Sequence, residues 1–185
     1  MAQPFLFLAS ACYGGMAQAG FMRSVLALRP ACAARGVTLQ LELGGGEALI
    51  GRGRAAMLAK FLAGAATHLL FADGDLAFDP ADVFRLIDAG EPVAGGDLGL
   101  LLVTRAAAQA MTDAHPELTA RLGDLRGAGA AGASMLFESM IEPETGRYLT
   151  DLKAFEARWR MLSGPTGGGP PANSRRNLAD DKLHG

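Results

Sequence analysis

Short apolar runs alternate with helical stretches from residue 4 to residue 111, and this alternation constrains the fold more than any other feature. Runs typical of strands occupy residues 4–11, 37–43, 69–72 and 99–103. Between them lie stretches with helical spacing of apolar residues, bounded by glycine or proline. Strands that alternate with helices usually form a parallel sheet covered by helices on both faces. The sequence therefore predicts the α/β class with a mostly parallel central sheet.

Several residues mark where the predicted helices begin and end. Asp79 is placed to cap the start of a helix whose first residue is Pro80, and Gly90 is placed to end that helix. Arg29 and Pro30 are expected to close the first helix, because proline is unfavourable inside a helix.

The chain is expected to form one domain over residues 1–162. Its last part is predicted to contain a short strand over 134–137 and a helix over 150–161. Residues 163–185 are rich in glycine and proline at their start, which indicates a flexible C-terminal tail.

Composition excludes several classes of function. The net charge of −2 provides no basic field, so a nucleic-acid partner is not expected. No apolar run is long enough to predict a membrane span. Cys12 and Cys32 lack the spacing of a disulfide framework or a zinc site, and no basic residue precedes Arg23, as a secretory signal would require. We therefore expect a cytoplasmic protein.

The third apolar run stops at two aspartates, Asp73 and Asp75, with Gly74 between them. Open α/β sheets bind ligands at the carboxyl ends of their strands. Carboxylate oxygens are hard ligands that hold Mg²⁺ or Mn²⁺ bridged to a diphosphate. The pattern therefore predicts a site for a metal ion and a diphosphate.

Two other interpretations of this segment remain open. Asp-Gly is a favoured two-residue hairpin turn, and apolar residues flank it on both sides. An apolar strand that ends in two such aspartates is also typical of haloacid-dehalogenase-type phosphatases. In those proteins the motif usually opens the domain and has Thr or Val two residues after its second aspartate. Here two predicted strands precede the motif, and Ala77 takes that place.

Four stretches together resemble bacterial and phage glycosyltransferases of the GT-A fold, related to family 2. They are ACYGG at 11–15, ALIGRGRA at 48–55, ATHLLFADGDLAF at 66–78 and YLTDLKAFEARWR at 148–160, of which the third is the most specific. The resemblance implies a Rossmann-like GT-A fold. It also implies transfer of a sugar from a nucleotide-diphosphate sugar to an acceptor that the sequence does not identify.

The resemblance assigns roles to individual residues. Asp73 and Asp75 would hold Mn²⁺ or Mg²⁺ and the diphosphate of the donor. Tyr13 would lie near the nucleotide base, and Arg52 or Arg54 would face the phosphates. Two residues that are two apart on a helix point to different faces, so at most one arginine is expected to serve.

His184 resembles a C-terminal histidine that serves many such enzymes as a further metal or diphosphate ligand, although a histidine near a chain end is otherwise usually solvated.

The match to this family is incomplete at the position of the general base. The family usually supplies the second acid of a Glu-Asp pair, which here reads Asp151-Leu152, and leucine cannot accept a proton. Asp151 is the candidate base, or else a charge that favours the start of a helix. The connection over 95–99 is also much shorter than in the family. The chain is therefore a reduced glycosyltransferase, a non-catalytic nucleotide-sugar-binding or structural domain, or a sequence from which a segment is missing.

Overall fold

A computed structural model of the chain describes residues 3–45, 47–95, 99–120 and 132–164, which include a five-stranded sheet of order β2-β1-β3-β5-β4. Its strands are β1 (Phe5–Cys12), β2 (Thr38–Gly45), β3 (His68–Ala72), β4 (Val93–Gly95) and β5 (Leu100–Thr104). The helices are α1 (Ala19–Ala34), α2 (Ile50–Ala63), α3 (Pro80–Asp88), α4 (Arg105–Ala114) and α5 (Asp151–Ser163). The chain thus has the predicted α/β class.

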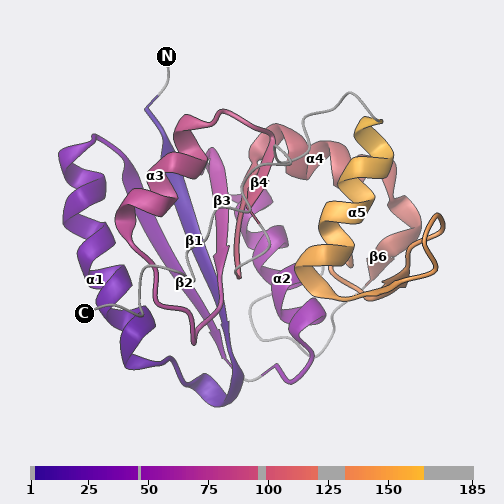
Figure 1. Cartoon of the computed structure of the whole chain (residues 1–185), viewed down its shortest axis with the longest axis horizontal. Coiled ribbons are helices and arrows are strands. Elements are labelled where there is room, and N and C mark those ends of the chain that lie inside the picture. The colour runs from indigo at the N-terminus through magenta and orange to yellow at the C-terminus, as the bar shows by residue number, and fades with distance from the viewer. Residues whose placement is uncertain (1–2, 46, 96–98, 121–131, 165–185) are drawn as a thin grey trace, which may run out of the picture.

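Helices cover both faces of the sheet, which gives three layers (Figure 1). On one face, Leu6 and Leu8 of β1 belong to the apolar cluster formed with α1 and α3. On the other face, Phe7 and Ala9 of the same strand belong to the cluster formed with α2, α4 and α5. Successive side chains of a strand point to opposite faces. A strand buried on both faces is therefore a nearly continuous apolar run, as residues 4–11 are apart from the buried Ser10.

The sheet is mixed, with a parallel core. Strand β1 runs parallel to β2 and β3, whereas β5 runs antiparallel to both β3 and β4. Residues 96–99 alone separate β4 from β5, and a parallel crossover needs about a dozen residues or more. The short connection therefore forces the chain to reverse, a direction that the alternation of strands and helices did not reveal.

The predicted start and end of α3 are confirmed. The Asp79 carboxylate accepts a hydrogen bond of 2.8 Å from the backbone N–H of Ala81, and Pro80 is the first helical residue. Gly90 follows the end of the helix with a φ of +67°, a left-handed conformation that glycine adopts without strain.

The predicted end of the first helix is wrong. Helix α1 continues through Pro30 to Ala34. Leu28 and Cys32, on either side of the proline, are both buried in the core beneath the helix. Proline removes one backbone hydrogen bond from a helix, and the packing of these two residues outweighs that loss.

The segment after residue 132 differs from the predicted strand over 134–137. Strand β7 (Ala133–Ser134) pairs with β6 (Thr119–Ala120), and it ends before Leu136 and Phe137, which turn into the core. A second pair, β8 (Met140–Ile141) and β9 (Tyr148–Leu149), forms a hairpin. The regular strand stops because the side chains of Leu136 and Phe137 reach the core beside α5.

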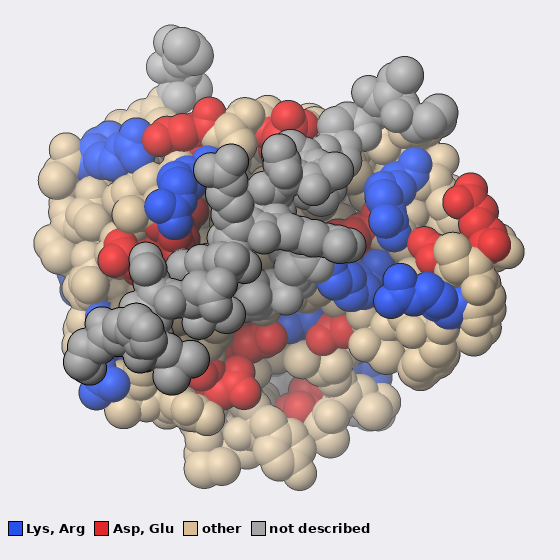
Figure 2. Space-filling model, in the orientation of Figure 1, with Lys and Arg blue, Asp and Glu red and all other residues tan. Residues whose placement is uncertain are grey.

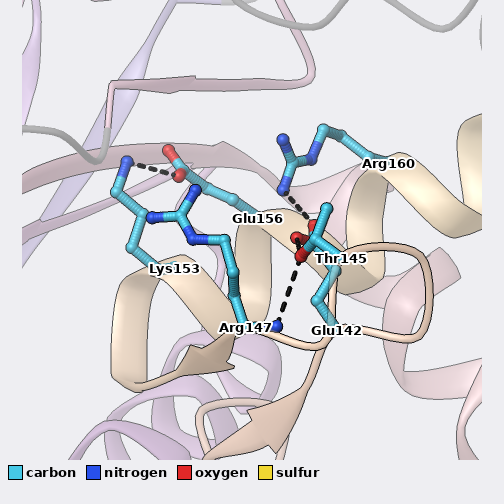
Figure 3. A network of polar contacts seen from close by, with 6 residues as sticks. All are labelled: Glu142, Thr145, Arg147, Lys153, Glu156 and Arg160. Atoms are coloured by element: carbon cyan, nitrogen blue, oxygen red, sulfur yellow. Dashed lines mark hydrogen bonds and ion pairs between the residues drawn. The ribbon is translucent and has the colours of Figure 1, made fainter.

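Polar contacts fasten this hairpin to α5 (Figure 3). The Glu142 carboxylate accepts hydrogen bonds from the Thr145 hydroxyl at 2.5 Å and from the Arg160 guanidinium at 3.1 Å. Lys153 and Glu156, one turn apart on α5, form an ion pair of 3.0 Å. The contact between Glu142 and Arg160 therefore holds the loop of the hairpin against the helix.

Helix α5 ends close to the predicted domain boundary, and residues 165–185 of the predicted tail lie outside the described residues. None of the helices in the described ranges combines the length and the apolar character that crossing a membrane requires.

We expect His68 to make stability depend on pH. Burial lowers the pKa of His68 below the usual value of a histidine, so the unfolded chain takes up a proton more readily than the folded one. Stability is therefore fully present above the unfolded pKa and is lost as the pH falls through the folded pKa. Urea denaturation between about pH 7 and about pH 5 should show a smaller loss in His68→Gln than in the wild type. Equal losses in the two proteins would contradict this expectation.

Candidate functional site

The carboxyl ends of β1 and β3 lie side by side at the point where the chain changes direction across the sheet. After β1 the chain passes through α1 to β2, and it then returns through α2 to β3 on the other side of β1. These two helices cover opposite faces of the sheet (Figure 1). Such a switch point is where open α/β sheets bind ligands. Tyr13 follows β1 directly, and Asp73 follows β3.

The segment Asp73-Gly74-Asp75 forms a tight turn at this edge. The backbone N–H of Leu76 donates to the Asp73 carbonyl at 3.0 Å, and the N–H of Gln18 donates to the Gly74 carbonyl at 2.7 Å. The chain then enters α3, and the sheet neighbours of β3 are β1 and β5. The hairpin interpretation of Asp-Gly is therefore wrong, because the residues after the turn do not pair with β3.

A buried arginine connects this turn to α5. The Arg54 side chain, which is 2% exposed, projects from α2 and forms ion pairs with the carboxylates of Asp73 and Asp151. Asp73 and Asp151 are 37% and 22% exposed. Residues from α2, β3 and α5, far apart in the sequence, thus meet in one charged cluster.

The charge on Arg54 is maintained despite its burial. Loss of solvent lowers the pKa of Arg54 to about 10, while the nearby Asp73 carboxylate acts in the opposite direction. The guanidinium therefore stays protonated at neutral pH. It also lies 5.7 Å from the centre of the Phe71 ring, within the range of a cation–π contact.

Asp151 is the first residue of α5, where an acid is favoured by the helix dipole. Its φ of +59° is uncommon for a residue with a side chain, and the ion pair with Arg54 accompanies this conformation. Leu152, the next residue, is buried in the same core cluster as Phe155. Asp151, not Leu152, is thus the acid that faces the cluster.

The two arginines of α2 point in different directions, as their spacing predicted. Arg52 Nε lies 3.3 Å from Glu47 Oε2 rather than beside Asp73. The same Glu47 carboxylate accepts a hydrogen bond of 3.0 Å from the backbone N–H of Leu49 at the start of α2. Arg54 is therefore the arginine that reaches the end of β3.

Tyr13 and Asp75 are exposed at the same edge of the sheet. Tyr13 is 74% exposed and lies in a 3₁₀ turn, Tyr13–Gly15, that follows β1. The turn packs closely against β2, since a Cβ added to Gly45 would lie 3.3 Å from the Cα of Gly15. Both predicted ligand-binding residues are thus accessible to a molecule that approaches this edge.

Two carboxylates at this edge have a donor set that suits a hard divalent cation. Asp73 Oδ1 accepts a hydrogen bond from the Arg54 guanidinium. Asp73 Oδ2 faces Gly99, and a Cβ added to Gly99 would lie only 2.8 Å from this oxygen. Among the described residues, no group of three or more His, Cys, Asp or Glu is arranged to hold a metal ion. Mg²⁺ is commonly held by one or two carboxylates together with phosphates and water. Asp73 and Asp75 fit that pattern, and His184 lies outside the described residues.

A cleft of about 200 Å³ lies beside Asp151. Its walls are residues 49–51 at the start of α2, residues 137–139, and residues 150–151. Glu138 is an exposed acid in this cleft, and the sequence interpretation missed it. The sequence carries a pattern that could have identified Glu138, because this acid directly follows an apolar run, as Asp73 does.

The buried cluster predicts different effects for the two arginines of α2. Arg54→Met leaves two neighbouring carboxylates without their cation, so it should lower the free energy of unfolding by about 3–5 kcal/mol. Arg52→Met removes a partly exposed ion pair and should cost at most about 1 kcal/mol. Urea denaturation of both variants measures the difference. Equal losses would mean that the cluster does not hold α2, β3 and α5 together.

Alanine substitutions at Gly99 and Gly90 together test how closely residue 99 packs against the Asp73 carboxylate. Both have positive φ angles, so alanine at either position should cost on the order of 1–2 kcal/mol in backbone strain. A Cβ at Gly90 meets nothing within 4 Å, whereas a Cβ at Gly99 meets the Asp73 carboxylate. Thermal unfolding should therefore show a larger loss for Gly99→Ala than for Gly90→Ala. The opposite order would indicate that Asp73 moves aside freely.

Comparison with protein-family models finds no match, and comparison with curated proteins finds none either.

Proposed function

We propose that this protein is a metal-dependent glycosyltransferase that uses a nucleotide-diphosphate sugar as donor. The supporting observation is the turn that carries Asp73 and Asp75 at the carboxyl end of β3, next to the end of β1. This position at a switch point of the sheet suits a nucleotide ligand. The resemblance of residues 66–78 to GT-A glycosyltransferases favours the same interpretation.

In this proposal, Asp73 and Asp75 hold Mn²⁺ or Mg²⁺ against the diphosphate. The cation would neutralise the charge that develops on the leaving nucleoside diphosphate. In the described part of this site, Asp73 and Asp151 pair with the guanidinium of Arg54, and the exposed Asp75 adds a third carboxylate. The remaining negative charge favours a divalent cation.

Tyr13 would place the nucleotide base. Its exposed ring at the end of β1 offers a flat apolar surface on which a base can stack. Gly14 and Gly15 follow with φ angles of +62° and +73°, and their lack of side chains leaves the adjacent surface open. A nucleotide lying across this edge could then reach from Tyr13 toward the carboxylates.

The second candidate is a domain that binds a nucleotide sugar without transferring it. The ion pair between Asp151 and Arg54 favours this alternative. A general base gives up its negative charge when it takes a proton, and the buried Arg54 would then lose one of its two partners. Asp151 is therefore better suited to positioning Arg54 than to accepting a proton.

Calorimetry with UDP, and separately with GDP, tests the proposal. We expect binding that requires Mn²⁺ and that weakens at least about tenfold, or about 1.4 kcal/mol, in Asp75→Asn. Asp75 is chosen because Asp73 also stabilises Arg54. Asp88→Asn is the matched control, because this exposed aspartate pairs with Arg35 at the other end of α3.

The outcomes separate the candidate functions. Metal-dependent binding together with release of nucleoside diphosphate from a nucleotide sugar supports the enzyme, and binding without release supports the non-catalytic domain. Hydrolysis of a generic phosphate ester without nucleotide affinity would instead support a haloacid-dehalogenase-type phosphatase. Equal nucleotide affinity in the wild type and Asp75→Asn would contradict the proposed metal site.

A further inference from the structure

The cleft beside Asp151 adjoins the proposed donor site through the charged cluster. Asp151 forms part of the cleft wall and also contacts Arg54, which in turn contacts Asp73. A molecule in the cleft would therefore lie one ion-paired side chain away from the residues proposed to hold the diphosphate. This is the arrangement that a second substrate requires.

The walls of the cleft combine apolar and polar groups. Leu49 and Ile50 are 58% and 44% exposed, large fractions for aliphatic side chains, and they line one side. Ser139 and Thr150 contribute hydroxyl groups, and Glu138 contributes a carboxylate. Pockets for hydroxylated ligands commonly pair an apolar surface with a few polar groups that fix orientation. The cleft therefore suits a molecule that carries hydroxyl groups on an apolar frame.

Two acids line the cleft, and their surroundings differ. Asp151 is engaged by the buried Arg54, whereas the Glu138 carboxylate makes no ion pair or hydrogen bond to any of the described residues. The exposed Glu138 carboxylate lies in the field of the buried Arg158 guanidinium but forms no direct ion pair with it, so it can take a proton without breaking an ion pair, whereas Asp151 cannot. Of the two acids, Glu138 is therefore the better proton acceptor.

The backbone of Glu138 is held in place from two sides. The buried Arg158 of α5 donates hydrogen bonds to the carbonyls of Leu136 at 2.7 Å and Glu138 at 2.9 Å. At the start of α2, a Cβ on Gly51 would lie 3.1 Å from both Glu138 Oε1 and the Phe137 carbonyl. The absence of a side chain at Gly51 thus lets this segment pack closely against the helix. A group fixed in this way is suited to directed proton transfer.

We propose that the cleft binds a hydroxyl-bearing acceptor and that Glu138, rather than Asp151, is the general base. This inference rests on the proposed glycosyltransferase function. The acceptor oxygen forms a bond to the anomeric carbon of the donor sugar while the bond from that carbon to the diphosphate oxygen breaks. The hydroxyl proton passes to Glu138, and the electron pair of the broken bond leaves with the nucleoside diphosphate. When water occupies the cleft, the same step hydrolyses the donor.

Glu138→Gln tests this proposal, because glutamine keeps the size of the side chain but cannot accept the proton. With UDP-glucose, UDP-galactose, UDP-N-acetylglucosamine and GDP-mannose as probes and Mn²⁺ present, release of nucleoside diphosphate should fall about 100-fold or more. Calorimetric affinity for UDP or GDP should stay within about twofold of the wild type. Glu144→Gln, which changes an exposed acid in the adjacent hairpin, is the matched control and should alter neither measurement.

Chemical rescue distinguishes a catalytic role from a structural one. Formate added to Glu138→Ala should restore part of the lost turnover, because a small carboxylate can occupy the vacated space and accept the proton. A residue that only maintained the shape of the cleft would not be replaced in this way. Failure of rescue would count against Glu138 as the base.

Three further outcomes would refute either the role of Glu138 or the proposed glycosyltransferase function. Turnover of Glu138→Gln within about threefold of an active wild type would refute the role of Glu138 and leave the glycosyltransferase proposal intact. A wild type that binds nucleotide but releases no product would also refute it. A wild type without nucleotide affinity would refute the proposed function itself, and the inference with it.

Discussion

The buried guanidinium of Arg54 is the interaction on which the arrangement of the candidate site depends. It pairs with Asp73 at the end of β3 and with Asp151 at the start of α5. Removing a charge from water is costly, and several well-placed partners are needed to compensate for it. Because both carboxylates supply that compensation, the positions of β3, α2 and α5 are linked through one side chain.

This link has consequences for the proposed chemistry. One carboxylate oxygen of Asp73 pairs with the buried Arg54, and the other oxygen points toward Gly99. Asp151 serves the same arginine and is therefore less available for proton transfer. The cluster thus favours a division of roles, in which Asp75 and the second oxygen of Asp73 face the cation. In the same proposal, Glu138, on the far wall of the cleft, faces the acceptor.

Hairpin β8–β9 and α5 support that wall from behind. Glu142 in the loop of the hairpin accepts a hydrogen bond from Arg160 (Figure 3). Arg158 donates hydrogen bonds to the carbonyls of Leu136 and Glu138. On the face seen in Figure 2, small groups of acidic and basic side chains lie interspersed among neutral surface. A mixed surface of this kind gives local charges a larger influence than any overall field.

Local patterns in the sequence determined the strands that are buried on both faces, the cap formed by Asp79, and the two carboxylates after β3. These features follow from the spacing of neighbouring residues, which the chain carries wherever it folds. The tertiary structure decided the direction of β5, the continuation of α1 through Pro30, the choice of Arg54 over Arg52, and the place of Glu138. Each of these features depends on packing between segments that are distant in the sequence. A local pattern of residues does not indicate which distant segment will pack against a side chain or pair with a buried charge.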